Sequence, residues 1–258
     1  MEDERSNGGR DQRVVSSCFG GGGFFAMAFA TGVADGMEEA GLPVRNGPML
    51  GTSGGAWAAG AIALELPLEL VVEAATVGKS SGVAHHEITR AVFGEQRDER
   101  VSTVAIERRT GRPRLLRAEH VGVADAVGAS SAAPGLFPPY PIGTVRYVDG
   151  GLYSPTSAHR AAAAQVLVVV APLAGPIVRP MTTLYGQLAR NEARLWRLRS
   201  GGDVIFVEPT GDIADAAGGG WRSLLDPATT NAVYERSRVL GRERAGRFLA
   251  TRPRLLAA

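Results

Sequence analysis

A serine between two glycines is the first group in this sequence that could do chemistry. Ser53 stands in GTSGG, residues 51–55, where Gly51 and Gly55 give the spacing Gly-x-Ser-x-Gly of a nucleophile elbow. In such an elbow the chain turns sharply from a strand into a helix, and the glycines leave space where side chains would collide. With 34 glycines in 258 residues and 14 serines, chance gives about 0.24 matches to the pattern, so its context must support it.

Two further glycine-rich turns follow segments that have the pattern of strands. One is the run of four glycines at residues 20–23, and the other is Asp-Gly-Gly at 149–151. In an α/β sheet the carboxyl ends of parallel strands meet at one edge, so we expect the three turns to converge there. They would bring together the three parts that acyl transfer requires. Ser53 would attack a carbonyl, bare backbone amides would stabilise the oxyanion, and Asp149 would accept the serine proton.

The rest of the chain predicts alternating strands and helices that position these turns. We expect strands over residues 14–19, 145–151, 165–172 and 203–209, and two strands joined by a turn within 101–117. Residues 47–50 are too few to assign by themselves, but a strand there would deliver Ser53 to its turn. We expect helices over residues 24–41, 55–66, 68–77, 182–199 and 226–252, and a short helix within 122–139 that Pro134 breaks. Gly32 and Gly36 are costly inside a helix unless another element packs closely against them.

This alternation predicts a three-layer α/β/α sandwich with a mostly parallel central sheet. A flexible tail is expected over residues 1–12, followed by a single domain over residues 13–258. The net charge of +2 gives no reason to expect nucleic acid as a partner, and the oligomeric state stays open. Cys18 is the sole cysteine, so neither an internal disulfide nor a cysteine zinc cluster is expected.

The sequence also carries expectations about location. The first residues are charged and lack the apolar region of a secretory signal, and no apolar run reaches the roughly 20 residues that a membrane-spanning helix needs. We therefore expect a cytoplasmic protein. Arg190, Arg194 and Arg197 fall on one face of the helix expected over 182–199, where they could attract anionic headgroups at a membrane surface or form an ordinary solvated face.

Three segments together resemble the patatin-like phospholipases, a family of lipid acyl hydrolases with a serine–aspartate dyad. They are residues 19–41, with the glycine run and the helix after it, residues 51–60, with the elbow, and residues 129–155, which include Asp-Gly-Gly. They come in the order that the family has. The resemblance implies a patatin-like fold, Ser53 as nucleophile, Asp149 as its base, a lipid or other acyl-ester substrate, and neither a metal nor an organic cofactor.

The resemblance also implies an oxyanion hole formed by the amides of Gly21, Gly22 and Gly23. Many relatives have an arginine and a further glycine just after the glycine run, whereas this chain has Phe24 and Phe25 followed by an alanine. The amides remain, but a cation beside them is lost. The apolar replacements are expected to widen a site for an acyl chain.

Phe24, Phe25 and Phe137 are the expected substrate-binding residues, with ordinary core packing as the alternative for each. Other readings of the site stay open. The dyad could serve a thioesterase, an acyltransferase or an amide hydrolase, or the scaffold could bind lipid or regulate a partner without turnover. The glycine run could also bind a nucleotide phosphate, although it lacks the Lys-Ser/Thr of a P-loop.

The four histidines are not expected to take part in the chemistry. A Ser-His-Asp triad of the α/β-hydrolase type needs a histidine after the acid, and of the four only His159 follows Asp149, too close to it for a separate late loop. His85, His86 and His120 come before it. All four are expected on the surface or in loops.

Overall fold

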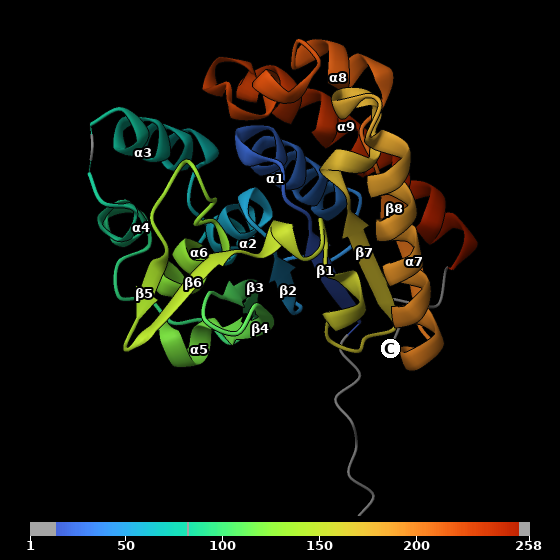
Figure 1. The fold of residues 1–258 in the computed structure, drawn as a ribbon. Helices are drawn as coiled ribbons and strands as arrows, with labels where there is room; N and C mark the ends of the chain where they lie inside the picture. Colours follow the sequence, from blue (N-terminus) through green and yellow to red (C-terminus); the bar gives the residue numbers. More distant parts are fainter. Residues whose placement is uncertain (1–13, 82, 253–258) are drawn as a thin grey trace, which may run out of the picture.

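The computed structural model describes residues 14–81 and 83–252, and the expected tail over 1–12 lies outside them. Its centre is an eight-stranded sheet in the order β5-β6-β3-β2-β1-β7-β8, with β4 paired to β3 outside this path (Figure 1). The strands are β1 (Val15–Phe19), β2 (Met49–Gly51), β3 (Val101–Glu107), β4 (Arg112–Arg117), β5 (Tyr140–Ile142), β6 (Val145–Asp149), β7 (Val166–Val170) and β8 (Asp203–Val207). β3, β2, β1, β7 and β8 run parallel, whereas β4, β5 and β6 form antiparallel pairs at one side.

Helices cover both faces of this sheet, which confirms the three-layer sandwich. The α-helices are α1 (Gly23–Glu39), α2 (Gly54–Ala63), α3 (Leu68–Ser81), α4 (His85–Phe93), α5 (Ala118–Val121), α6 (Val123–Ser130), α7 (Thr182–Ser200), α8 (Gly211–Ala216) and α9 (Thr230–Thr251). The 3-10 turns are η1 (Gly150–Leu152), η2 (Ala158–Arg160), η3 (Pro172–Ala174), η4 (Pro176–Val178), η5 (Trp221–Leu225) and η6 (Pro227–Thr229). The larger core lies under α1, α2, α6 and α9, and the smaller one under α7. Within the described residues, no helix is long and apolar enough to cross a membrane.

The continuous apolar pattern of β7 follows from its burial between these two layers. Successive side chains of a strand point to opposite faces of the sheet. Val168 and its alternate neighbours join the larger core, whereas Leu167 and Val169 pack in the smaller one, which also contains Trp196 of α7. A strand with both faces covered needs apolar residues at every position, which explains the uninterrupted run.

One edge of β3 is shared by two other strands, and this sharing brings the turns after β2 and β6 together. β4 pairs along residues 102–107 of β3 and so occupies one edge of it. β2 runs parallel along the first half of the other edge and ends with Gly51 beside Thr103. β6 runs antiparallel along the second half and ends with Asp149 beside Ala105. The ends of β2 and β6 therefore meet head to head, with only Val104 between their partners on β3.

The elements that sequence reasoning did not predict are short or weakly patterned. They are α4, α5, β5 and α8, and of these β5 and α5 have only three and four residues. Short segments of this kind are held by their neighbours in the fold more than by their own propensity. The predicted strands and longer helices are all present, with ends that differ by a few residues.

The glycines of the helix pair α1 and α9 show why Gly32 and Gly36 are tolerated in a helix. α1 and α9 cross so closely that a Cβ added at Gly36 would lie 1.9 Å from the carbonyl oxygen of Arg238. The fit is reciprocal, because a Cβ added at Gly241 of α9 would lie 2.3 Å from the carbonyl oxygen of Val33. α1 is thus almost wholly buried between the sheet and α9, as its nearly all-apolar sequence requires.

Two glycine-to-alanine changes within α9 test this contact. Gly241→Ala should lower the free energy of unfolding by about 1–3 kcal/mol, because the added methyl group overpacks the crossing. Gly246→Ala is the matched control, since nothing lies within 4 Å of the added Cβ. It should raise stability by about 0.5–1 kcal/mol through helix propensity alone. Urea unfolding followed by circular dichroism measures both, and equal effects of the two changes would contradict the close crossing.

Candidate active site

The turn between β2 and α2 has the geometry of a nucleophile elbow. Ser53 has φ 53° and ψ −124°, a backbone conformation that residues with a side chain rarely adopt. A Cβ added at Gly51 would lie 2.4 Å from the Cα of Ala56, and one added at Gly55 would lie 2.1 Å from the carbonyl oxygen of Phe19. Both glycines are therefore required by close backbone contacts, as the motif predicted.

The structure brings Ser53 and Asp149 together. The Ser53 Oγ donates a hydrogen bond to Oδ2 of Asp149 at 2.7 Å, and Oδ1 of the same carboxylate accepts one from the Gly151 amide, also at 2.7 Å. Ser130 supports the nucleophile from α6, because its Oγ accepts from the Ser53 amide at 3.1 Å and donates to the Val104 carbonyl at 2.7 Å. Sequence reasoning gave no role to Ser130, and no local pattern indicates one.

The carboxyl group of Asp149 is buried, and burial raises its pKa to about 6, although the hydrogen bonds from Ser53 and Gly151 lower it in part. Removing an ionised carboxylate from water is costly, and two donors compensate only partly for the lost hydration. A carboxylate with a pKa closer to neutrality is a stronger base than an exposed one. Asp149 is therefore suited to accept a proton from the hydroxyl group that it contacts.

The glycine run lies beside the serine, but its amides differ in availability. The amide of Gly21 donates to the carbonyl of Pro155 at 2.8 Å and is thus already engaged. Gly22 (φ 141°) and Gly23 (φ 59°) hold conformations that disfavour any side chain, and they lead directly into α1. Within residues 14–81 and 83–252, no acceptor is hydrogen-bonded to either of these two amides. Gly54, the first residue of α2, lies against Gly23, since a Cβ added to Gly54 would be 2.3 Å from the Gly23 carbonyl oxygen.

A mostly apolar cavity of about 120 Å³ begins at Ser53 and extends between α1, α2, α3 and α4. Phe24 and Phe137 line it, as expected, together with Met27 and Trp57. Phe25 does not line it. It is fully buried and stacks on Phe29, with ring centroids 5.8 Å apart, because its position on α1 turns it into the core.

His85 is also placed differently from the prediction, because it is buried and lines the cavity. The Ser131 hydroxyl donates to the Val127 carbonyl at 2.7 Å, so its oxygen must accept from the His85 Nε2, at 3.1 Å, and from the Trp57 Nε1. Burial lowers the pKa of His85 to about 4, and its ring stacks on Phe137 with centroids 4.0 Å apart. His85 is therefore a neutral part of the cavity wall at pH 7.

The remaining histidines agree better with the prediction. His120 is exposed and His86 is partly exposed, whereas His159 lies in η2 with its ring mostly covered. In the described part of the chain, no hydrogen bond joins a histidine to either Ser53 or Asp149.

We compared the chain with models of known protein families. Residues 74–162, about a third of the chain, match the family model described as "Patatin-like phospholipase". The resemblance to the patatin-like phospholipases is confirmed. The matched region contains Asp149 and its two glycines, but it ends short of the serine elbow and the glycine run on the N-terminal side. The similarity that we noted at residues 19–41 and 51–60 therefore rests on their motifs and on the geometry above.

Two further comparisons add little. The crystal structure of VipD from Legionella pneumophila is similar over 93% of this chain and 67% of its own, with 11% sequence identity and a TM-score of 0.46. No curated protein matches the sequence significantly.

Replacing Asp149 by asparagine tests the cost of its burial. The folded pKa lies about two units above that of an exposed aspartate, so folding binds a proton between about pH 4 and 6, and stability falls as the pH rises through this window. Asparagine keeps the acceptor for Gly151 and does not ionise. Relative to wild type, the free energy of unfolding of Asp149→Asn should be about 2 kcal/mol higher at pH 8 than at pH 4, so the variant is relatively more stable at the higher pH. Urea unfolding at both pH values measures it, and a pH-independent difference would contradict the buried ionised carboxylate.

Proposed function

We propose that this protein is a serine hydrolase that cleaves acyl esters of lipids through a Ser53–Asp149 dyad. The observation that carries the proposal is the 2.7 Å hydrogen bond between the two side chains at the end of an apolar cavity. The match to the patatin-like phospholipases supports a lipid acyl hydrolase in general terms. The geometry supplies a nucleophile, a base and a place for an acyl chain.

The proposed reaction has two halves. Ser53 Oγ attacks the ester carbonyl while its proton passes to Oδ2 of Asp149, and the alcohol leaves with that proton as the tetrahedral intermediate collapses. Water then attacks the acyl-enzyme while Asp149 accepts its proton, and that proton passes to Ser53 Oγ as the intermediate collapses and releases the fatty acid. The oxyanion that forms in each half would accept hydrogen bonds from the amides of Gly22, Gly23 and Gly54. These amides begin α1 and α2, so both helix dipoles favour negative charge there.

We infer that the acyl chain enters the cavity along α1 and that the lipid approaches at its open end. Leu136 and Leu225 line the cavity and are 47% and 37% exposed, so they form an apolar border that can meet aggregated lipid. The arginines of α7 are on the other face of the sheet, away from this opening. Arg190 is paired with Glu208 at 2.7 Å, as an ordinary solvated face would be. Transient contact with a membrane surface is therefore proposed at the opening.

The alternatives on the same dyad differ in the group that is cleaved or accepts the acyl chain. A thioesterase, an amide hydrolase and an acyltransferase would use the same serine and carboxylate, and no residue of the described site favours one of them. A scaffold that only binds lipid would need neither a bonded dyad nor free amides. A panel of oxygen esters, thioesters and amides with matched acyl chains distinguishes among these activities, with Ser53→Ala as the inactive control.

The pH dependence of kcat/KM tests Asp149 as the base. Because the ionised form must accept the proton, and burial raises its pKa to about 6, activity should rise with pH and level off above 7. At pH 5 it should be about tenfold below the plateau. His85, with a pKa of about 4, stays neutral over this range and does not contribute. The measurement uses a soluble short-chain ester, and a profile that is flat from pH 5 to 8 would contradict the proposal.

Filling the cavity tests where the acyl chain lies. Ala75 of α3 lines the cavity, so a tryptophan there would occupy the space proposed for the acyl chain. Ala75→Trp should lower kcat/KM for a ten-carbon ester about tenfold or more, because each buried methylene contributes about 0.8 kcal/mol. A two-carbon ester should be cleaved nearly as before. Ala74→Trp is the matched control, because Ala74 is next to Ala75 in the chain but lines a different groove, between α3 and α4. Substrates must be below their micellar concentrations. Equal losses on both esters, or the same effect from both variants, would place the acyl chain elsewhere.

A further inference from the structure

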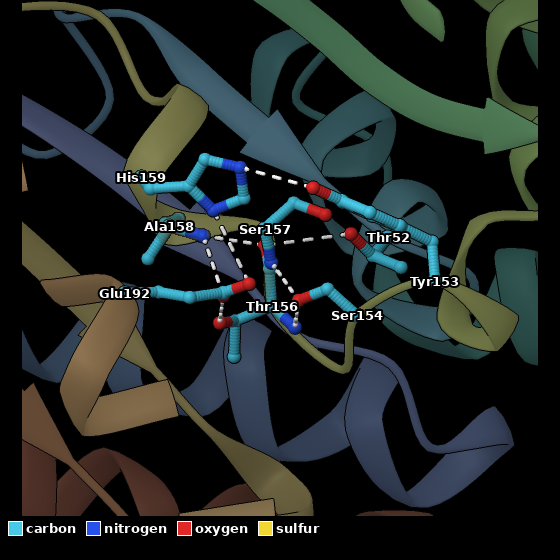
Figure 2. Close-up of polar contacts among 9 residues, drawn as sticks. Thr52, Tyr153, Ser154, Thr156, Ser157, Ala158, His159 and Glu192 are labelled. Carbon is cyan, nitrogen blue, oxygen red and sulfur yellow. Dashed lines mark hydrogen bonds and ion pairs between the residues drawn. The ribbon is translucent and has the colours of Figure 1, made fainter. Parts of the chain in front are cut away.

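A partly buried carboxylate outside the dyad ties the active-site loops to the opposite layer of the fold. Glu192 lies on α7, and its side chain is only 14% exposed. Its Oε2 accepts hydrogen bonds from the Thr156 hydroxyl at 2.6 Å and from the Ala158 amide at 3.0 Å, and its Oε1 lies 3.2 Å from Nδ1 of His159 (Figure 2). All three partners belong to the loop that follows Asp149. None of them takes part in the proposed chemistry.

This loop is also fastened within itself. The hydroxyl oxygen of Ser154 accepts from the amides of Thr156 at 3.2 Å and of Ser157 at 2.7 Å. Ser157 has φ 55°, a left-handed conformation that a non-glycine residue adopts only where its surroundings impose it. Figure 2 shows Glu192 reaching this turn from α7, with Ser154 on the other side of it. Glu192 and Ser154 thus hold residues 154–158 in a single shape.

Two successive carbonyl groups of the loop then hold the machinery of the proposed reaction. The Pro155 carbonyl accepts from the Gly21 amide at 2.8 Å, which fixes the glycine run just before Gly22 and Gly23. The Thr156 carbonyl accepts from the Cys18 thiol at 3.0 Å and, at the longer distance of 3.5 Å, from the hydroxyl of Thr52, the residue before Ser53. The same short loop therefore contacts the glycine run and the elbow, and residues 150–153 connect it to Asp149.

We propose that Glu192 is a positioning residue: through the loop 154–158 it holds the glycine run and the elbow in the relative placement that the transition state needs. The inference rests on the proposed function. Glu192 accepts hydrogen bonds from Thr156 and Ala158, within the same short loop whose Pro155 and Thr156 carbonyls contact the glycine run and the elbow. A misplacement of about 1 Å can lower a rate about a hundredfold, so loosening this loop acts on turnover more than on binding.

Three variants separate positioning from general stabilisation. Glu192→Ala removes all three contacts and should lower the rate of acyl-enzyme formation per active site by about 10- to 100-fold, with the dissociation constant of the ester within about twofold. The acylation rate of Glu192→Gln should stay within about threefold of the wild-type rate. Its amide oxygen can accept hydrogen bonds from Thr156 and Ala158 while its NH₂ group faces His159. Glu208→Ala removes another acid that pairs with α7, at the exposed Arg190, and should leave the rate unchanged.

Two measurements separate these cases. Acylation by a chromogenic ester with enzyme in excess gives the rate per site, and the final stoichiometry of fluorophosphonate labelling counts the active sites. A variant that only destabilises the fold lowers the stoichiometry and leaves the rate per site unchanged, whereas we expect Glu192→Ala to lower the rate and keep the stoichiometry. A lower stoichiometry with an unchanged rate, or a Glu192→Gln variant as slow as Glu192→Ala, would overturn the proposal.

Amide hydrogen exchange at Gly21 tests the same contact without any turnover. Glu192→Ala should accelerate exchange of the Gly21 amide about tenfold or more, because its acceptor on Pro155 is no longer held, whereas Glu208→Ala should not. Unchanged exchange at Gly21 in Glu192→Ala would overturn the proposal whatever the kinetics show. If the wild type does not cleave the ester, the proposed function fails, and the exchange result alone decides whether Glu192 holds the loop.

Discussion

The single constraint on which this site depends is that β2 and β6 share one edge of β3. Gly51 ends β2 beside Thr103, and Asp149 ends β6 beside Ala105, so two strands of opposite direction deliver their last residues to the same place. The elbow then turns Ser53 away from β2 into contact with the carboxylate. Strand pairing is rigid and fixed in register, which is why two residues 96 positions apart in sequence can hold a 2.7 Å hydrogen bond. The antiparallel edge of the sheet is therefore a requirement of the site.

The two helical layers have different tasks around this junction. The layer that contains α1 and α2 provides the cavity, the start of two helices and the serine itself, whereas α7 on the opposite face supplies Glu192 to the loop behind them. Two features of the site are unfavourable on their own: the strained backbone of Ser53 and the buried carboxyl group of Asp149, whose pKa burial raises to about 6. They persist because densely packed elements surround them, and α1 in particular is fixed by its close crossing with α9.

Sequence alone predicted what short patterns encode. The Gly-x-Ser-x-Gly spacing, the glycine run and the Asp-Gly-Gly turn each have a local physical cause, and the apolar run of β7 reports burial on both faces. The sequence could not predict which side chains line the cavity and which are covered, because that depends on tertiary contacts. Phe24 and Phe25 are neighbours of the same type, yet only Phe24 lines the cavity, because one residue of rotation along α1 turns the next side chain into the core. His85 and Glu192 resemble any surface residue in sequence, and only the packing of α4 and α7 buries the first and partly covers the second.

Covalent labelling of the nucleophile tests the central claim most directly. A serine is a poor nucleophile unless a base and an oxyanion site activate it, so reaction with a fluorophosphonate reports the whole arrangement at once. We expect one adduct per chain, located on Ser53 by mass spectrometry of the digested protein, with labelling abolished in Ser53→Ala and strongly slowed in Asp149→Asn. An adduct on another serine, or labelling of Ser53→Ala at the wild-type rate, would contradict it.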